Sequence, residues 1–188
     1  MLIKILSCCI RHLEVDVYGT DWCSDPGLKC DRSQEKTCLE MLDTSYKVIV
    51  CLIVFSQFSF LQFYLSLENS LCTDYVTEKF WKVLDYNVIP VVLNGANMSN
   101  IAPKHSYIDF KDFNDSIEET AEYMKRVSGD DELFASYFWW RDYYSSTQST
   151  EDHAWCSLCS ALHNSSQESS VISDFNSWWQ VGGQCHSV

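Results

Sequence analysis

Residues 63–90 read FYLSLENSLCTDYVTEKFWKVLDYNVIP, a run whose pattern predicts strand, loop, helix and strand in that order. Two apolar strands flank a polar loop, and the loop opens a helix at about Val76 and Thr77. Such α/β half-units bind their ligands beyond the carboxyl end of a strand. The stretch therefore predicts an α/β fold with a ligand site between Glu68 and Lys79.

The side chains of this loop suit a phosphorylated sugar. Lys79 adds a full positive charge near a helix start, where unpaired N–H groups already favour phosphate. Glu78 is able to stabilise the positive charge that develops at the anomeric carbon of a reacting sugar. Tyr75 offers an aromatic face and a hydroxyl, and Asn69 both donates and accepts hydrogen bonds. Together these residues describe a nucleotide-sugar site.

Each of these residues also has a purely structural interpretation. Glu78 and Lys79 are a common capping and solubility pair at a helix start. Tyr75 is compatible with the core, Asn69 with a turn, and Glu68 with a solvated charge at a strand end. Chemistry alone therefore specifies no more than an α/β domain that could take a phosphorylated ligand.

Composition narrows the class of protein. The chain has 188 residues, 13 Lys+Arg, 26 Asp+Glu and a net charge of -13, a length that fits one domain or a fragment of a larger enzyme. Nucleic acid is an improbable partner, because phosphate binding needs clustered Lys and Arg. Residues 1–10 are apolar but short and lack a cleavage site, which suggests that the chain begins internally or that its true start is missing.

Ten cysteines and three sequons favour an oxidising secretory lumen. Cys156 and Cys159 have the spacing of a zinc-ligand pair, but no second pair follows at zinc-finger spacing, so disulfides are favoured over zinc. The sequons begin at Asn97, Asn114 and Asn164.

Periodicity and caps predict the remaining elements. Ser116 caps a helix, Asp130 or Asp131 caps the next, and a Ser-rich tail from Asn164 is expected to be loosely ordered. An aromatic stripe in the second of these helices is expected to pack in the core. The stripe is Phe134, Tyr137, Phe138, Trp140 and Tyr144. The expected strands are 13–18, one that begins at Val88 and ends before a turn around Asn94 and Gly95, and a short one within 102–113. The expected helices are 34–46, 117–127, 132–144 and 151–163.

Residues 48–67 carry no charge and are long enough to cross a membrane. Ser and Gln residues interrupt the run, no basic residues flank its far side, and its second half overlaps the strand that enters the loop. A single-span membrane protein is therefore an alternative that the composition disfavours.

Residues 63–92 resemble the signature of the α1,3-fucosyltransferases, a family of inverting transferases that use GDP-fucose. The resemblance runs roughly over 15–163, with one gap, and is greatest to invertebrate enzymes that act on the N-glycan core. It also draws on five shorter segments: VDVYG at 15–19, AP at 102–103, SYI at 106–108, YFWW at 137–140 and WCSLC at 155–159.

This resemblance implies a GT-B type enzyme of two Rossmann-like halves, of which the chain holds the C-terminal, donor-binding half. Lys79 would hold the diphosphate, and Glu78 would lie near the fucose anomeric carbon. No metal or other cofactor is expected, because no Asp-x-Asp pair lies near the loop. Asn94 replaces the first of two family glycines, and Arg11 lies too close to the upstream strand to act as the family's diphosphate arginine. The GDP-fucose site would be lined by Tyr64, Asn69, Tyr75, Val76, Glu78 and Lys79.

The implied reaction transfers L-fucose from GDP-fucose to a GlcNAc of a glycoprotein N-glycan in α1,3 linkage, with Lewis-type acceptors still open. The implied location is the lumenal side of the Golgi membrane, through an N-terminal anchor that is missing here. Cys156 and Cys159 resemble cysteines that pair with partners elsewhere in the enzyme. The acceptor half, which supplies the general base, is absent, so a non-catalytic donor-binding fragment is the alternative.

The gap in the resemblance is residues 48–62. In the family, the Tyr46-Lys47 position continues directly into the strand at Phe63. The intervening residues begin with Val, whose codons start GT, and end with Gln, one of whose codons ends AG, which are the borders of an unspliced intron. We expect the division 1–47 start of the donor domain, 48–62 retained intron or gene-model error, 63–163 donor-binding domain and 164–188 tail. Sequencing the transcript tests it.

Overall fold

The computed structural model describes residues 14–16, 52–54, 62–145, 151–163 and 171–187. The expected helix at 34–46, Arg11 and Asn164 lie outside these ranges. At the N-terminal side, β1 (Glu14–Asp16) pairs antiparallel with β2 (Leu52–Val54). β1 confirms part of the strand expected at 13–18. β2 lies within the suspected intron, whose status stays a prediction.

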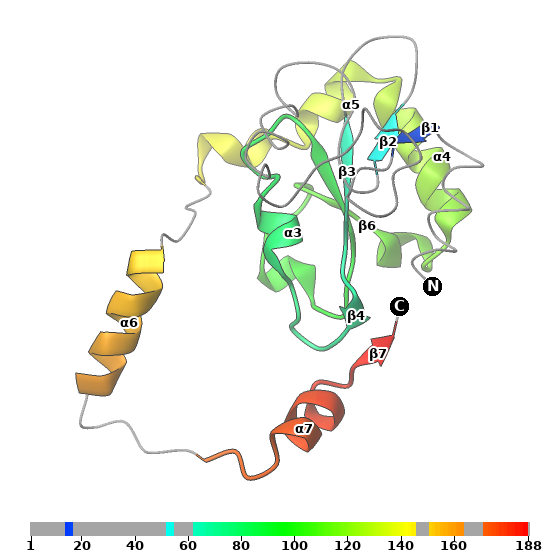
Figure 1. Cartoon of the computed structure of the whole chain (residues 1–188). Coiled ribbons are helices and arrows are strands. Elements are labelled where there is room, and N and C mark those ends of the chain that lie inside the picture. Colours follow the sequence, from blue (N-terminus) through cyan, green and yellow to red (C-terminus); the bar gives the residue numbers. More distant parts are fainter. Residues whose placement is uncertain (1–13, 17–51, 55–61, 146–150, 164–170, 188) are drawn as a thin grey trace.

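The centre of the fold is a parallel three-stranded sheet in the order β3 (Phe63–Leu67), β5 (Ile89–Leu93) and β6 (Ile108–Asp109). β3 and β5 align in register from Phe63 opposite Ile89 to Leu67 opposite Leu93. Every residue of both strands is buried, as expected for a parallel sheet covered on two faces. Figure 1 shows these strands side by side in the core of the molecule. The prediction of two strands around a loop and helix is confirmed.

The two faces of the sheet pack against different helices. Phe63, Leu65 and Leu67 pack with α4 (Ile117–Ser128) and neighbouring segments on one face. On the other face, Val92 packs with Phe80 of the short helix α3 (Glu78–Trp81). Side chains alternate between the two faces along β3, so Ser66 points toward α3. Glu68, two residues later, lies on the same side.

α4 begins as its sequence predicts. Ser116 Oγ accepts a hydrogen bond from the Glu119 backbone N–H at 3.2 Å. Acidic residues occupy the first turn and basic residues the last, which suits the helix dipole. Asp130 caps α5 (Asp131–Ser136) in the same way, through the Leu133 N–H at 3.0 Å.

The expected single helix at 132–144 is wrong in its length. α5 ends at Ser136, and a 3₁₀ helix, η5 (Trp139–Asp142), follows. The break lets the aromatic stripe divide, because Tyr137 joins the core under α4 whereas Trp140 joins the core under α3. Tyr144 is exposed instead of packed.

The C-terminal part carries more structure than expected for a loose tail. After α6 (Glu151–His163), which has the predicted bounds, residues 171–187 form α7 (Phe175–Ser177), a π-helical turn η6 (Trp178–Gly182) and β7 (His186–Ser187). β7 pairs antiparallel with β4 (Ser70–Leu71), directly after β3. Figure 1 shows α6 standing apart and β7 returning toward β4.

The remaining short elements are 3₁₀ helices, η3 (Met98–Asn100) after β5 and η4 (Phe110–Phe113) after β6. Within the described ranges, no helix has both the length and the apolar composition needed to cross a membrane. Residues 63–67, the end of the long uncharged run, are a strand inside the sheet. The described residues 52–54 and 63–67 of this run are strands and are not part of a membrane-spanning helix.

Candidate active site at the β3–α3 junction

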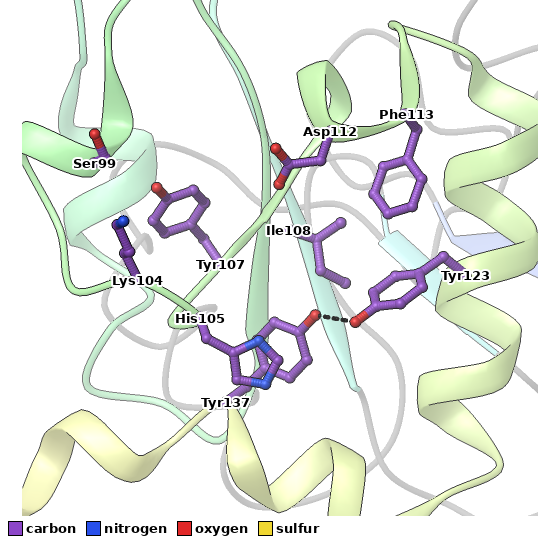
Figure 2. Close-up of a pocket in the computed structure, with 9 residues that line it drawn as sticks. All are labelled: Ser99, Lys104, His105, Tyr107, Ile108, Asp112, Phe113, Tyr123 and Tyr137. Atoms are coloured by element: carbon purple, nitrogen blue, oxygen red, sulfur yellow. Dashed lines mark hydrogen bonds between the residues drawn. The ribbon is translucent and has the colours of Figure 1, made fainter.

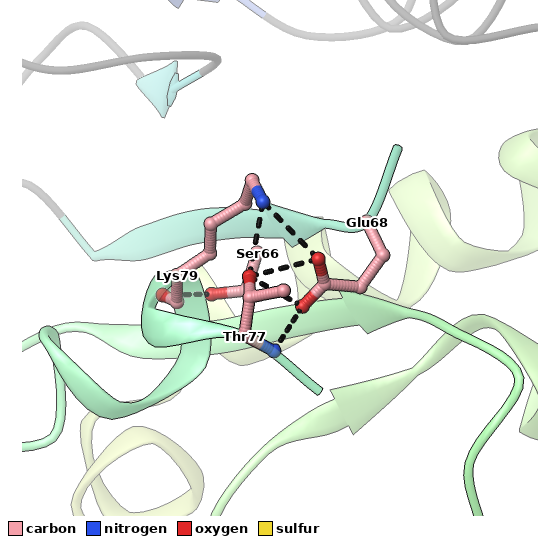
Figure 3. Close-up of polar contacts among 4 residues, drawn as sticks. All are labelled: Ser66, Glu68, Thr77 and Lys79. Carbon is pink, nitrogen blue, oxygen red and sulfur yellow. Dashed lines mark hydrogen bonds and ion pairs between the residues drawn. The ribbon is translucent and has the colours of Figure 1, made fainter. Parts of the chain in front are cut away.

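The carboxylate of Glu68, one residue beyond β3, organises the start of α3. Glu68 is 1% exposed, and its oxygens accept from the Thr77 N–H at 2.7 Å and the Thr77 hydroxyl at 2.8 and 2.9 Å. Lys79 Nζ lies 3.1 Å from the same carboxylate (Figure 3). Glu68 is therefore a buried ion-pair partner, and its interpretation as a solvated strand-end charge is wrong.

Lys79 is held at both ends of its side chain. Its ammonium donates to Glu68 and to Thr77 Oγ1, the latter at 3.0 Å. Its backbone carbonyl accepts from Ser66 Oγ at 3.0 Å (Figure 3). The side chain remains 27% exposed. An ammonium has three hydrogens, so one is left over from these two contacts and can reach a ligand.

The helix dipole contributes less here than the sequence suggested. α3 has only four residues, and Thr77 precedes it in an extended conformation without a side-chain cap hydrogen bond. A macrodipole grows from aligned peptide units, so one turn supplies only a weak field. Anion binding at this junction therefore depends on the Lys79 charge.

Glu78 and Val76 face a large groove instead of the Lys79 network. The groove has a volume of about 1250 Å³ and runs between α3, the 99–106 segment and the η5 region. Its aromatic walls come from Trp81, Trp139 and Trp140. This volume exceeds the usual few hundred to about 1,000 Å³ of a small-ligand site. Glu78 is exposed in it, where its carboxylate is accessible to a bound molecule.

The other expected donor residues surround the junction without meeting in that groove. Tyr64 is buried within β3, and Asn69 is exposed immediately after Glu68. Tyr75 packs edge-on against Trp179 of η6, with ring centroids 5.9 Å apart. The structure thus brings Val76 and Glu78 to one surface and leaves the remaining predicted residues around it.

A disulfide between Cys72 and Cys185 fixes the loop that carries Tyr75. The Thr73 N–H also donates to the Gly183 carbonyl at 2.7 Å. Gly95 packs so tightly against the Cys72 backbone that a Cβ would lie 2.2 Å from its carbonyl oxygen. The sequence had singled out neither Cys72 nor the end of the tail as part of this region.

Asn94, which stands where the resembled family has a glycine, stabilises the turn after β5. It is buried, its Oδ1 accepts from the Ala96 N–H at 3.0 Å, and its amide donates to Met98 Sδ at 3.1 Å. Local hydrogen bonds therefore accommodate Asn94. Gly95 is the position where there is no room for a side chain.

Comparison with known proteins identifies the chain's relatives. The family model described as glycosyltransferase family 10 (fucosyltransferase) C-term matches residues 3–178. The chain belongs to this fucosyltransferase family. The resemblance seen in the sequence is thereby confirmed, and it extends beyond the 15–163 segment.

Individual fucosyltransferases support the same assignment. Alpha-(1,3)-fucosyltransferase C of Drosophila melanogaster is 44% identical over 90% of this chain and 35% of its own length. Glycoprotein 3-alpha-L-fucosyltransferase A of Drosophila melanogaster is 37% identical over 93% of the chain and 31% of its length. The mouse 4-galactosyl-N-acetylglucosaminide 3-alpha-L-fucosyltransferase 9 is 36% identical over 63% of the chain and 33% of its length. The chain spans about a third of these relatives.

A second, smaller cavity of this fucosyltransferase-family chain lies beside β6 and has a volume of about 320 Å³. Figure 2 shows the Tyr123 and Tyr137 hydroxyls meeting in it, at 2.7 Å. The His105 ring stacks on Tyr137 with centroids 3.9 Å apart, and its Nε2 lies 2.8 Å from Ser136 Oγ. The Ser136 hydroxyl donates to the Leu133 carbonyl, so Nε2 carries the hydrogen that reaches Ser136.

Burial favours the neutral forms of Tyr137 and His105 in this second cavity, which Lys104 and Asp112 also line. Desolvation, followed by the hydrogen bond with Tyr123, raises the pKa of Tyr137 far above its ordinary value. Desolvation lowers the pKa of His105. These neutral groups satisfy one another through hydrogen bonds and stacking, which is the pattern of a structural cluster.

The cysteine and glycosylation candidates fall on exposed positions where they are described. Cys156 and Cys159 on α6 are exposed free thiols, so their pairing with partners elsewhere stays a prediction. Asn97 is exposed, and its Oδ1 accepts from Ser99 Oγ at 2.7 Å. Asn114 is exposed in the left-handed region at φ 54°. Among the described residues, no cluster of His, Cys, Asp or Glu is arranged to hold a metal ion.

Proposed function

We propose that this chain binds GDP-fucose at the β3–α3 junction and forms the donor half of an inverting α1,3-fucosyltransferase. The acceptor would be a GlcNAc of a glycoprotein N-glycan, and the enzyme would work on the lumenal side of the Golgi membrane. Membership of the fucosyltransferase family supports the donor. The names of the two Drosophila relatives support the α1,3 linkage and a glycoprotein acceptor. The layered sheet is compatible with a Rossmann-like half.

The observation that carries the proposal is the placement of Glu78 beside Lys79. Lys79 keeps one ammonium hydrogen for a phosphate oxygen, as the hydrogen-bond inventory of the junction implies. Glu78 is exposed on the adjoining groove. A donor with its diphosphate at Lys79 would place its sugar on that side, where a carboxylate stabilises positive charge at the anomeric carbon.

The chemistry divides between this chain and the acceptor half. The acceptor hydroxyl attacks the fucose anomeric carbon, the bond to the GDP oxygen breaks, and a base removes the hydroxyl proton. In this proposal Lys79 stabilises the leaving diphosphate and Glu78 the oxocarbenium-like centre. By resemblance, the base belongs to the acceptor half, and no step assigned to the described residues requires a metal.

Calorimetric titration of the chain with GDP and GDP-fucose tests the proposal. Lys79→Ala should weaken GDP binding at least tenfold, or about 1.4 kcal/mol. Glu78→Ala should leave GDP binding nearly intact and reduce the preference for GDP-fucose. Lys125→Ala, on the exposed part of α4, is the control. Equal GDP affinity in Lys79→Ala and the unmodified chain would refute the site.

A donor-binding chain without transfer activity is the second candidate, because the proposal assigns no described residue to the base that removes the acceptor proton. Radiolabelled GDP-fucose and an N-glycan acceptor separate the two. Fucosylated product supports the enzyme, and tight donor binding without product supports the donor-binding chain.

A further inference from the structure

We infer that Glu68, acting with Thr77, is a positioning residue that aims the Lys79 ammonium at the donor diphosphate. The inference rests on the proposed function, because it concerns what Lys79 does for a bound nucleotide. It adds two residues to the six expected at the donor site. Neither is proposed to touch the donor.

The first argument is the burial of the Glu68 charge. A carboxylate that is 1% exposed is stable only when donors surround it. Here those donors are the Thr77 N–H, the Thr77 hydroxyl and the Lys79 ammonium. Glu68 also donates its own backbone N–H to the Leu93 carbonyl of β5 at 3.1 Å. The carboxylate is thus tied to the sheet, which makes it a fixed reference point for Lys79.

The second argument is the direction of each hydrogen. The Thr77 hydroxyl has one hydrogen, which it gives to Glu68 at 2.8 to 2.9 Å. Its oxygen therefore serves as the acceptor for Lys79 at 3.0 Å. Both acceptors lie on one side of the ammonium, so its remaining N–H capacity points away from Glu68 and Thr77. Figure 3 shows the atoms that hold Lys79 in this position.

The third argument is preorganisation. A lysine side chain is flexible, and holding it for a ligand costs rotamer entropy. Glu68 and Thr77 fix its ammonium, and Ser66 fixes its backbone carbonyl, before any ligand is present. Binding of a diphosphate then requires little further ordering of Lys79.

A double-mutant cycle with two ligands tests the inference. GDP and guanosine are titrated into the unmodified chain, Glu68→Gln, Lys79→Ala and the double variant. Gln keeps the size of Glu68 but replaces one acceptor oxygen with an NH₂ group. We expect Glu68→Gln to weaken GDP about tenfold, to leave guanosine unchanged, and to change GDP less than twofold when Lys79 is already Ala.

The alternative outcomes separate the inference from the function on which it rests. If Glu68→Gln weakens GDP and guanosine alike, or equally in both Lys79 backgrounds, Glu68 is only structural and the inference fails alone. If Lys79→Ala leaves GDP binding unchanged, the proposed function is wrong, and the inference is then wrong as well. Should Glu68→Gln not fold, Thr77→Val must weaken GDP selectively and Thr77→Ser must restore it.

Discussion

The β3–α3 junction and the cavity beside β6 both gather polar side chains at the edge of the core, yet they satisfy them in different ways. At the junction, a buried carboxylate is matched by an ammonium that keeps one hydrogen to spare. Beside β6, the Tyr123 and Tyr137 hydroxyls hydrogen-bond to each other, and the His105 ring stacks on Tyr137 and hydrogen-bonds to Ser136. The comparison teaches that a ligand needs unused bonding capacity, which the proposed donor site at the junction retains in the Lys79 ammonium.

Removal of the Cys72–Cys185 disulfide should give the largest difference in stability between the β3–α3 junction and the region beside β6. Cys185→Ser removes a link that closes 113 residues, and chain entropy for a loop of that size suggests a cost of about 5 kcal/mol. Hydrogen exchange should show lost protection at Thr73 and β4, with little change in α4. Cys159→Ser, at an exposed free thiol, is the matched control. If α4 loses as much protection as Thr73 and β4, the disulfide stabilises the whole fold and not the junction in particular.

The ion pair should give the next largest effect. Lys79→Met leaves the buried Glu68 carboxylate without its cation, so urea unfolding should show a loss of about 3 kcal/mol. Replacing both partners, as Glu68→Gln with Lys79→Met, should recover most of that loss because no charge then remains buried. A double variant less stable than Lys79→Met would show that the pair is not the source of the effect.

The hydroxyl pair in the neutral cluster should matter less. Tyr137→Phe removes one partner of the 2.7 Å contact with Tyr123 and should cost about 1 kcal/mol in urea unfolding. GDP affinity should stay unchanged, in contrast to the junction variants. Tyr143→Phe, on an exposed ring, controls for loss of a hydroxyl. A change in GDP affinity for Tyr137→Phe would mean that the β6 cavity serves the donor site.

His105 should give the smallest effect, visible in the pH dependence of stability. Burial holds the His105 pKa below 6.5, so the folded chain favours the neutral ring. Its contribution is present above pH 6.5 and is lost as the pH falls toward the lowered pKa. Asn tolerates the φ of 60° at this position. His105→Asn should therefore reduce the change in the free energy of unfolding between pH 5.5 and 7. If the free energy of unfolding of His105→Asn depends on pH as it does in the unmodified chain, His105 is not the cause of that dependence.

The sequence predicted the parallel strands, the cap at Ser116 and the family because each depends on local pattern or on a long motif. It missed the role of Glu68, because burial of a strand-end carboxylate is decided by Thr77 and Lys79 folding back over it. The sequence held one signal for this burial. Glu68 follows Ser66 by two residues, so both side chains lie on the same face of the sheet. The break after Ser136 was missed because two separate cores compete for neighbouring aromatic residues.

The tail could not be placed from its composition. A Ser-rich sequence predicts weak order, but β7 pairing, the Trp179 contact with Tyr75 and the Cys185 bond are all long-range. Nothing local in the sequence identifies which of ten cysteines pairs with Cys72. The lining of the groove near Glu78 was likewise missed, because it joins α3 to segments 99–106 and 139–145.

The Cys72–Cys185 bond also sets an order of events during synthesis. Cys185 is translated 113 residues after Cys72, which at ordinary elongation rates is a delay of roughly 6 to 23 seconds. During that interval the sheet and α4 can form on the emerging chain, while the loop bearing Tyr75 waits for its covalent partner. The loop from Cys72 to Tyr75 therefore reaches its final structure only after translation has passed residue 185 and the two thiols have been oxidised.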